Sequence, residues 1–143
     1  MDWKQIKPQH YHVEPVEHIC ITNLVKLNDY DRLYENQNNL QHPCWIEFCE
    51  KNNTTVQLKE KIVDLDFSKD VMCLWFFKER SDGTASYVHL DGKQIEYYPN
   101  KFLISKSKNI KLVTTTRKYI RNPVMQVDID LKTYNNIVAP FQK

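Results

Sequence analysis

Three histidines near the start of this 143-residue chain have a spacing that suggests metal chemistry. His10 and His12 are separated by one residue, so on a strand both imidazoles lie on one face, and His18 is a candidate third ligand. Zinc is the metal that such a set would hold. The spacing matches no closed zinc framework, and an exposed arm also carries histidines for no chemical reason. We therefore expect no metal here.

The four cysteines, Cys20, Cys44, Cys49 and Cys73, suggest zinc or thiol chemistry. Zinc sites usually use tighter cysteine pairs than this chain offers. Cys20 and Cys73 fall in apolar runs, where cysteine behaves as a small buried residue. Cys44 lies near a predicted helix start, but the sequence assigns it no base. We expect buried thiols rather than a zinc site or a nucleophile.

Two pairs of aspartates, Asp64 with Asp66 and Asp128 with Asp130, are each spaced to share one face of a strand. Paired carboxylates can perform acid–base catalysis or bind a metal. Their clean alternation with apolar residues instead indicates the solvated face of a half-buried strand. The chain also contains no Gly-x-Ser-x-Gly motif and no phosphate-binding glycine loop.

The triplet His89-Leu90-Asp91 has the His-x-Asp spacing that begins the iron-binding triad of non-haem oxygenases. In layout, Cys20-Ile21-Thr22-Asn23-Leu24 before an acidic amphipathic segment resembles the entry to prolyl-hydroxylase-type 2-oxoglutarate oxygenases. The stretch from Met72 to Ile129 resembles their later strands. It includes Asp82-Gly83, Tyr98-Pro99-Asn100 and Arg117.

This resemblance implies a double-stranded β-helix in which His89 and Asp91 hold iron and Arg117 or Arg121 holds 2-oxoglutarate. The family also needs a histidine downstream of its His-x-Asp pair, and none follows His89. Asp91 additionally belongs to an Asp-Gly turn. If the resemblance holds, we expect a fold that has lost its metal, and we expect no iron and no other cofactor.

The charge is divided unevenly along the chain, although its net value is only +2. Residues 1–96 carry 11 basic and 16 acidic side chains, whereas residues 97–143 carry 9 basic and 2 acidic ones. No acidic residue occurs between Glu96 and Asp128. Basic side chains bind phosphates, and aromatic side chains nearby can stack on bases. The predicted binding residues are Lys101, Lys106, Lys108, Lys111, Arg117, Lys118, Arg121 and Tyr119.

Two helices are predicted to precede the basic region. Leu27, Tyr30, Leu33 and Leu40 fall near helical spacing, with Asn28 suited to an N-terminal cap. Pro43 is suited to the first position of a second helix, which we expect to end at Asn52 and Asn53. A short buried strand is predicted at 19–25, before these helices.

The later apolar pattern has a period of two, which predicts strands. Two Asp-Gly turns, Asp82-Gly83 and Asp91-Gly92, predict a three-stranded meander of 71–80, 84–90 and 93–98. Further strands are predicted within 56–67 and at 102–105, 110–115 and 124–131. The fold class is therefore α+β, with two N-terminal helices packed on a mostly antiparallel sheet or a small jelly-roll-like barrel of six to eight strands.

We expect one domain over 1–143. It comprises an extended arm at 1–18, a strand and two helices at 19–53, a β-rich region at 54–131, and a short helix and tail at 132–143. No apolar run is long enough to cross a membrane, and no signal peptide precedes the domain, which predicts a cytoplasmic protein. The lysine- and asparagine-rich, glycine-poor composition resembles that of accessory proteins of low-GC genomes, including phages. A phage-encoded chain would act in the host cytoplasm.

The preferred interpretation is a non-enzymatic binding protein whose basic C-terminal half engages nucleic acid or an acidic protein surface. One alternative is a reduced iron/2-oxoglutarate oxygenase-like enzyme using His89 and Asp91. Another is a structural or assembly subunit, either a homo-oligomer or part of a larger complex, whose aromatic surface forms the interface.

Overall fold

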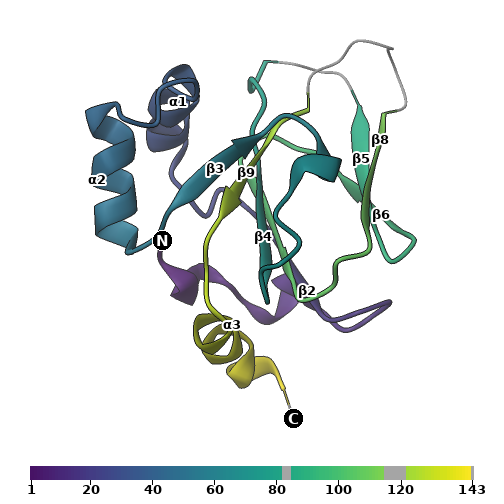
Figure 1. Ribbon diagram of the computed structural model, residues 1–143. Helices are drawn as coiled ribbons and strands as arrows, with labels where there is room; N and C mark the ends of the chain where they lie inside the picture. The colour runs from purple at the N-terminus through teal and green to yellow at the C-terminus, as the bar shows by residue number, and fades with distance from the viewer. Residues whose placement is uncertain (82–84, 115–121, 143) are drawn as a thin grey trace.

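The computed structural model describes residues 1–81, 85–114 and 122–142 (Figure 1). In this part of the chain the fold is α+β, with three α-helices and nine strands. The strands form an antiparallel six-stranded sheet in the order β1-β2-β7-β4-β9-β3 and an antiparallel three-stranded sheet in the order β6-β5-β8. The prediction of two N-terminal helices packed on a mostly antiparallel sheet is confirmed. The nine strands exceed the predicted six to eight.

The elements follow one another along the chain in a simple order. The α-helices are α1 (Leu27–Glu35), α2 (Pro43–Asn52) and α3 (Leu131–Val138). The strands are β1 (Tyr11–His12), β2 (His18–Thr22), β3 (Val56–Lys59), β4 (Met72–Phe76), β5 (Ser86–Leu90), β6 (Lys93–Glu96), β7 (Lys101–Ser105), β8 (Ile110–Thr114) and β9 (Val124–Val127). The short 3-10 helices are η1 (Trp3–Gln5), η2 (Pro8–His10), η3 (Ile62–Asp64) and η4 (Ala139–Phe141).

The six-stranded sheet is the middle of three layers, because both of its faces are apolar. Successive side chains of a strand point to opposite faces, so β4 serves two cores at once. Cys73 and Trp75 face the helices, whereas Met72, Leu74 and Phe76 face the three-stranded sheet. Figure 1 shows α1 and α2 on one side of the large sheet, the small sheet on the other, and α3 across one end.

The helices begin and end for local reasons that the sequence displays. Pro43 occupies the first turn of α2, and Asn53 ends that helix in the left-handed conformation with a φ of 48°. Asp130 caps α3, since its Oδ1 accepts a hydrogen bond from the Thr133 backbone N–H at 2.7 Å. Helix α1 starts at Leu27, so Asn28, predicted as its cap, lies inside the helix.

The predicted three-stranded meander is wrong in its first connection. β5 and β6 do form a hairpin through Asp91 and Gly92, with φ angles of 48° and 84°. β4, however, pairs with β7 and β9 in the large sheet, while β5 begins the small one. The chain between them passes from one sheet to the other, and Asp82-Gly83 lies outside the described residues. An Asp-Gly pair in the sequence therefore does not establish that the strands on either side of it pair with each other.

Two other segments differ from the expected strands. The alternation of Val63, Leu65 and Phe67 predicted a strand, but 62–64 form η3, and Ile62 and Leu65 are buried against the small sheet. Residues 1–18, expected as an extended arm, contain η1 and η2 before the two-residue strand β1. None of the helices in the described ranges combines the length and apolar character needed to cross a membrane.

Candidate functional site

The predicted basic residues divide into three groups in the structure. Lys106 and Lys108 lie in the connection between β7 and β8, and Lys111 follows on β8, so these three gather at one end of the small sheet. Lys101 stands at the opposite end of β7, beside Thr22 of β2. The other predicted binding residues, Arg117, Lys118, Tyr119 and Arg121, lie outside the described residues.

Within the described ranges the lysines of the β7–β8 end form no ion pair, although Glu17 lies near enough to Lys106 for the two charges to interact. The two ion pairs of the described residues lie elsewhere and join Lys69 to Asp128 and Arg80 to Asp31. Lys106, Lys108 and Lys111 are exposed, and the Lys106 ammonium lies 5.8 Å from the centre of the Tyr134 ring. This end of the molecule therefore presents positive charge that no described acid neutralises by direct contact.

The outer face of the three-stranded sheet adds two rings that the sequence analysis did not select as binding residues. Along β5, Ser86, Val88 and Leu90 are buried, so Tyr87 and His89 point outward, where both are half-buried. His89 lies between Gln94 of β6 and Lys111 of β8. The alternation of residues 86–90 was the signal that could have placed both rings on one face.

His89 and Asp91, which the oxygenase resemblance implies as iron ligands, lie on β5 and in the turn that follows it. Asp91 sits in the β5–β6 turn, where Oδ2 accepts a hydrogen bond from Ser107 and Oδ1 accepts one from Asn109 at 3.2 Å. Its carboxylate thus joins that turn to the β7–β8 connection. Across the described residues, no group of three histidine, cysteine or acidic side chains is placed to hold a metal ion.

The N-terminal histidines separate into one ring at the end of a 3-10 helix and one stacked pair. His10 ends η2, and its Nδ1 accepts a hydrogen bond from the Lys7 backbone N–H at 2.9 Å. His12 instead pairs with His18 across β1 and β2, with ring centroids 4.9 Å apart. The expectation that His10 and His12 share a strand face is wrong because His10 belongs to a 3-10 turn.

The cysteines are all free thiols, with Cys44 and Cys73 buried and Cys20 and Cys49 half-buried. Burial raises the pKa of the Cys73 thiol, which keeps it protonated and unreactive. Cys44 has a neighbour that the sequence did not assign: His42 Nδ1 lies 3.0 Å from its Sγ. The same nitrogen accepts the Cys44 backbone N–H at 3.1 Å, so His42 acts as the cap of α2.

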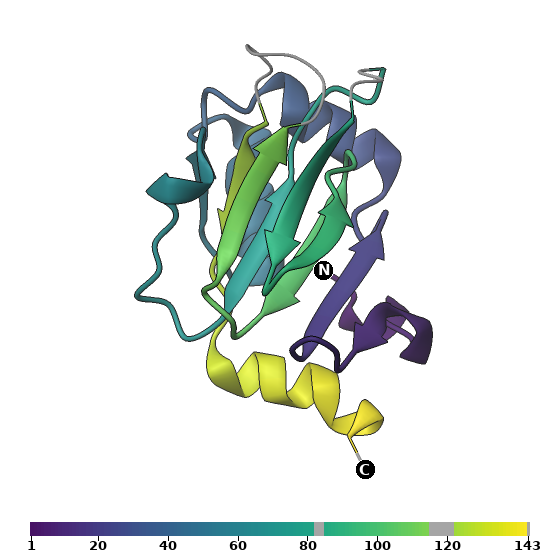
Figure 2. The same ribbon diagram turned by 90° about the vertical axis from the view of Figure 1, so that its right-hand side faces the viewer.

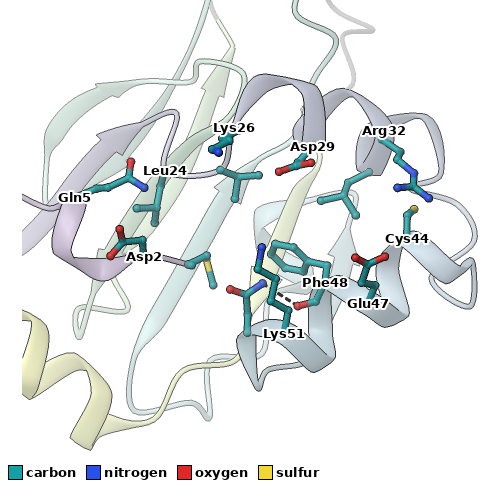
Figure 3. A pocket seen from close by; sticks show the side chains of 14 residues that line it. Asp2, Gln5, Leu24, Lys26, Asp29, Arg32, Cys44, Glu47, Phe48 and Lys51 are labelled. Carbon is teal, nitrogen blue, oxygen red and sulfur yellow. Dashed lines mark hydrogen bonds between the residues drawn. The ribbon is translucent and has the colours of Figure 1, made fainter.

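A pocket of about 460 Å³ opens between α1, α2 and the N-terminal segment. Its floor is apolar and includes Leu24, Leu33 and Phe48. Figure 3 shows charged side chains of both signs around this floor. They are Asp2, Lys26, Asp29, Arg32, Glu47 and Lys51. Because acids and bases alternate along the rim, the pocket favours no ligand of one charge sign.

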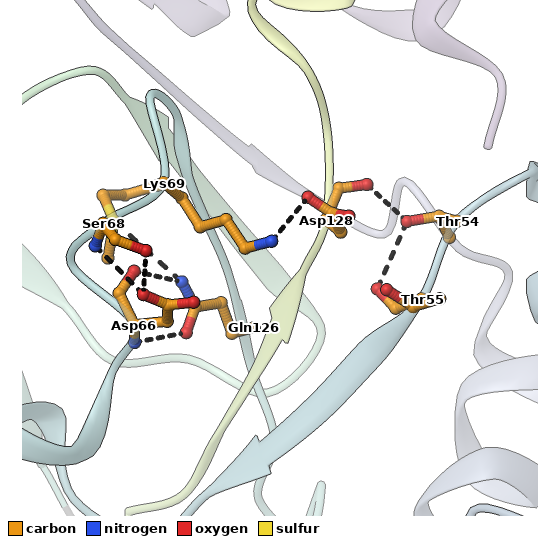
Figure 4. A network of polar contacts seen from close by, with 8 residues as sticks. Thr54, Thr55, Asp66, Ser68, Lys69, Gln126 and Asp128 are labelled. Carbon is orange, nitrogen blue, oxygen red and sulfur yellow. Dashed lines mark hydrogen bonds and ion pairs between the residues drawn. The ribbon is translucent and has the colours of Figure 1, made fainter.

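Three of the four paired aspartates, Asp66, Asp128 and Asp130, make contacts within the fold. Asp128 pairs with Lys69 at 3.5 Å, while Asp130 caps α3. Asp66 bonds to Ser68, and buried Gln126 clamps the Asp66 backbone through bonds of 2.8 and 3.0 Å (Figure 4). Neither pair lies on one strand face, because η3 and the end of β9 interrupt the predicted strands.

Comparison with known proteins adds no identity to this geometry. No family model, no curated protein and no solved structure matches the chain.

Proposed function

We propose that this protein binds single-stranded nucleic acid on the outer face of its three-stranded sheet. The observation that carries the proposal is the placement of His89 directly between Gln94 and Lys111, with Tyr87 two residues along the same central strand. Figure 2 views the molecule from the side of this sheet. A sheet face with rings on its central strand and lysine beside them suits unpaired bases.

The lysines supply the phosphate contacts in this proposal. Lys106, Lys108 and Lys111 are exposed and form no ion pair with any acid in the described part of the chain. Their charge is therefore available to displace the counterions of a nucleic acid backbone. Each phosphate that is neutralised on a single strand adds about 0.7 to the slope of log affinity against log salt concentration.

The rings favour a single strand over a duplex or an acidic protein. A base can stack on Tyr87 or His89 only when its face is unpaired and turned outward. An acidic protein surface would use the lysines but gain little from a flat ring. Glu96 lies opposite Tyr87 on this face, and its carboxylate repels phosphates. The phosphates of the bound nucleic acid are therefore expected to run along the Lys111 side.

The test is fluorescence anisotropy with a labelled single-stranded oligonucleotide at several salt concentrations. The triple variant Lys106→Gln, Lys108→Gln and Lys111→Gln should lower the salt slope by about 2, which corresponds to three lost phosphate contacts. A control variant loses the same charge elsewhere, at exposed Lys4, Lys26 and Lys51, and should bind like the parent protein. Equal losses in both triple variants would contradict the proposal.

The contribution of the rings is tested by Tyr87→Ala and Tyr87→Phe. Loss of a stacking ring costs about 1–3 kcal/mol per base, so the alanine variant should bind roughly 5- to 150-fold more weakly, while phenylalanine retains most affinity. Glu96→Gln should strengthen binding because it removes a repelling carboxylate. Preference for a duplex or an acidic peptide over the single strand would refute this assignment of the face.

A further inference from the structure

The pocket between α1 and α2 has the size and the floor of a small-molecule site. Its volume of about 460 Å³ falls within the range of about 300–1,000 Å³ that is typical of such sites. Leu24 and Leu33 supply apolar surface to it, each with only 3% of the residue exposed, and Phe48 completes the floor. An apolar group of a ligand can therefore leave water here, which favours binding.

Two tryptophans hold the floor in place from behind. The Phe48 ring stacks on Trp75 with ring centroids 5.4 Å apart, and it meets the Trp45 ring edge to face at 5.8 Å. Neither tryptophan has any exposed surface. The floor is therefore formed before a ligand arrives, so binding needs little ordering of these side chains.

The two helical walls of the pocket each present one acid and one base. On α1 these are Asp29 and Arg32, and on α2 they are Glu47 and Lys51 (Figure 3). A spacing of three or four residues along a helix allows such charges to pair. None of the four nevertheless belongs to an ion pair of the described residues, and all four are exposed. Both signs of charge are therefore available to a ligand.

The acid beside Arg32 in the sequence does not neutralise it. The Asp31 carboxylate instead accepts two hydrogen bonds from the Arg80 guanidinium, at 2.8 and 2.6 Å. A guanidinium binds a carboxylate through two parallel hydrogen bonds, so Arg32 is suited to a ligand carboxylate. The carboxylates of Asp29 and Glu47 can in turn accept hydrogen bonds from an ammonium group.

We propose that this pocket binds a free α-amino acid with an apolar side chain. Such a molecule carries a carboxylate and an ammonium on one carbon atom, which matches the two signs of charge on the walls. Arg32 binds the carboxylate, and Asp29 and Glu47 bind the ammonium. The ligand's side chain lies on the floor formed by Leu33 and Phe48. A ligand with a single charge would leave wall charges of the same sign repelling it.

This site is separate from the nucleic acid face proposed above. The large sheet lies between them, with α1 and α2 on one side and the three-stranded sheet on the other (Figure 1). The two proposals therefore use different residues and different ligands, and neither depends on the other.

The experiment is calorimetric titration of the full chain with L-phenylalanine, accompanied by NMR titration of the backbone amide signals. We expect saturable binding, with the shifted signals concentrated in α1, α2 and residues 1–5. L-Phenylalanine amide lacks the carboxylate and N-acetyl-L-phenylalanine lacks the ammonium, so each should bind about tenfold more weakly or worse. Glycine keeps both charges but has no apolar side chain, and it should bind more weakly by a similar factor.

Variants of the walls assign each charge to its partner. Arg32→Gln and Asp29→Asn should each weaken binding of L-phenylalanine about tenfold or more. Arg32→Gln should have little further effect on the amide, because the amide has no carboxylate for Arg32 to bind. Glu50→Gln and Lys4→Gln remove exposed charges from α2 and from the N-terminal segment, outside the pocket, and should bind like the parent protein.

Three results would overturn the proposal. They are the absence of saturable binding, equal affinity for L-phenylalanine and its two derivatives, and amide shifts confined to the strands. The derivatives probe the same contacts in the parent protein, so a wall variant that unfolds does not prevent the test. The triple variant of Lys106, Lys108 and Lys111 should still bind L-phenylalanine, and Arg32→Gln should still bind the oligonucleotide. Failure of one proposal is therefore distinguishable from failure of the other.

Discussion

Replacing Asn100 should be among the most damaging single changes to this fold. Asn100 lies between β6 and β7 in the sequence, and its side chain is fully buried. Its Oδ1 accepts the Trp75 indole N–H at 2.9 Å, and its Nδ2 donates to the Val25 carbonyl at 2.6 Å. The residue therefore joins the central strand β4 to the segment that leads into α1, and this connection holds the helical layer on the sheet.

The expected loss can be worked out from these two bonds. Asn100→Ala leaves the Trp75 N–H and the Val25 carbonyl without this partner, and each buried group costs about 1–3 kcal/mol, so the loss is about 2–6 kcal/mol. Asn100 also has a φ of 62°, a conformation that costs alanine about 1 kcal/mol more than glycine. Asn100→Gly should therefore lose about 1 kcal/mol less than Asn100→Ala. Against a typical total of about 5–15 kcal/mol, either loss is large.

The assay is urea denaturation followed by both tryptophan fluorescence and far-ultraviolet circular dichroism. Two probes are needed because Asn100 contacts Trp75 and its loss also changes the fluorescence signal. Asn136→Ala changes an exposed asparagine of α3 and should alter the free energy of unfolding by no more than about 0.5 kcal/mol. A loss below about 1 kcal/mol for Asn100→Ala, or equal losses for Ala and Gly, would refute the reasoning.

Three other changes test separate parts of the structure. Burial, with a smaller contribution from the neighbouring ammonium of Lys93, lowers the pKa of His18. As the pH falls, His18 in the unfolded chain therefore binds a proton before His18 in the folded protein does. The urea midpoint should fall as the pH drops below about 6.5, and this fall should be smaller in His18→Gln. Native protein treated with iodoacetamide should be labelled at Cys49 before Cys73, as peptide mass spectrometry would show, because Cys73 is fully buried and its pKa is raised. Gln126→Ala should cost about 1–3 kcal/mol in urea denaturation and speed hydrogen exchange at the Asp66 N–H, which loses its acceptor.

Each of these tests has an outcome that contradicts its premise. An identical pH dependence in the parent and in His18→Gln would mean that His18 is not the group that resists protonation. Native labelling of Cys73 at the rate of Cys49 would mean that β4 is not enclosed by both cores. Unchanged exchange at Asp66 in Gln126→Ala would show that the side-chain clamp does not hold the 65–70 segment.

Local signals in the sequence predicted local structure well. Pro43 and the left-handed Asn53 bracket α2, and Asp91-Gly92 forms the expected β5–β6 turn. In each case the residue at the boundary itself carries the conformation, either through a fixed φ or through tolerance of a positive one. The same logic placed the hairpin and the helix starts to within a few residues.

Pairing between distant strands could not be predicted in this way. The apolar run of β4 predicts a central strand, but nothing in its residues identifies β7 and β9 as its neighbours. The stacked pair of His12 and His18 depends on the register of β1 against β2. A shift of one residue in that register would send one ring to the opposite face. The sequence does not reveal this register, and the spacing of the histidines alone therefore paired His12 with His10.

In the described ranges, no lysine of the basic C-terminal half forms an ion pair with an acid of the first half. An acidic first half packed on a basic second half would neutralise it, and the sequence left that possibility open. Asp2 and Asp130 instead cap helices, Asp91 bonds to Ser107 and Asn109, and Glu17 bonds to tyrosine hydroxyls. The Asp91 carboxylate therefore lies at the β7–β8 end itself, bonded to the two residues that flank Lys108. Its hydrogen bonds go to Ser107 and Asn109, and none of the ion pairs in the described ranges involves Lys106, Lys108 or Lys111.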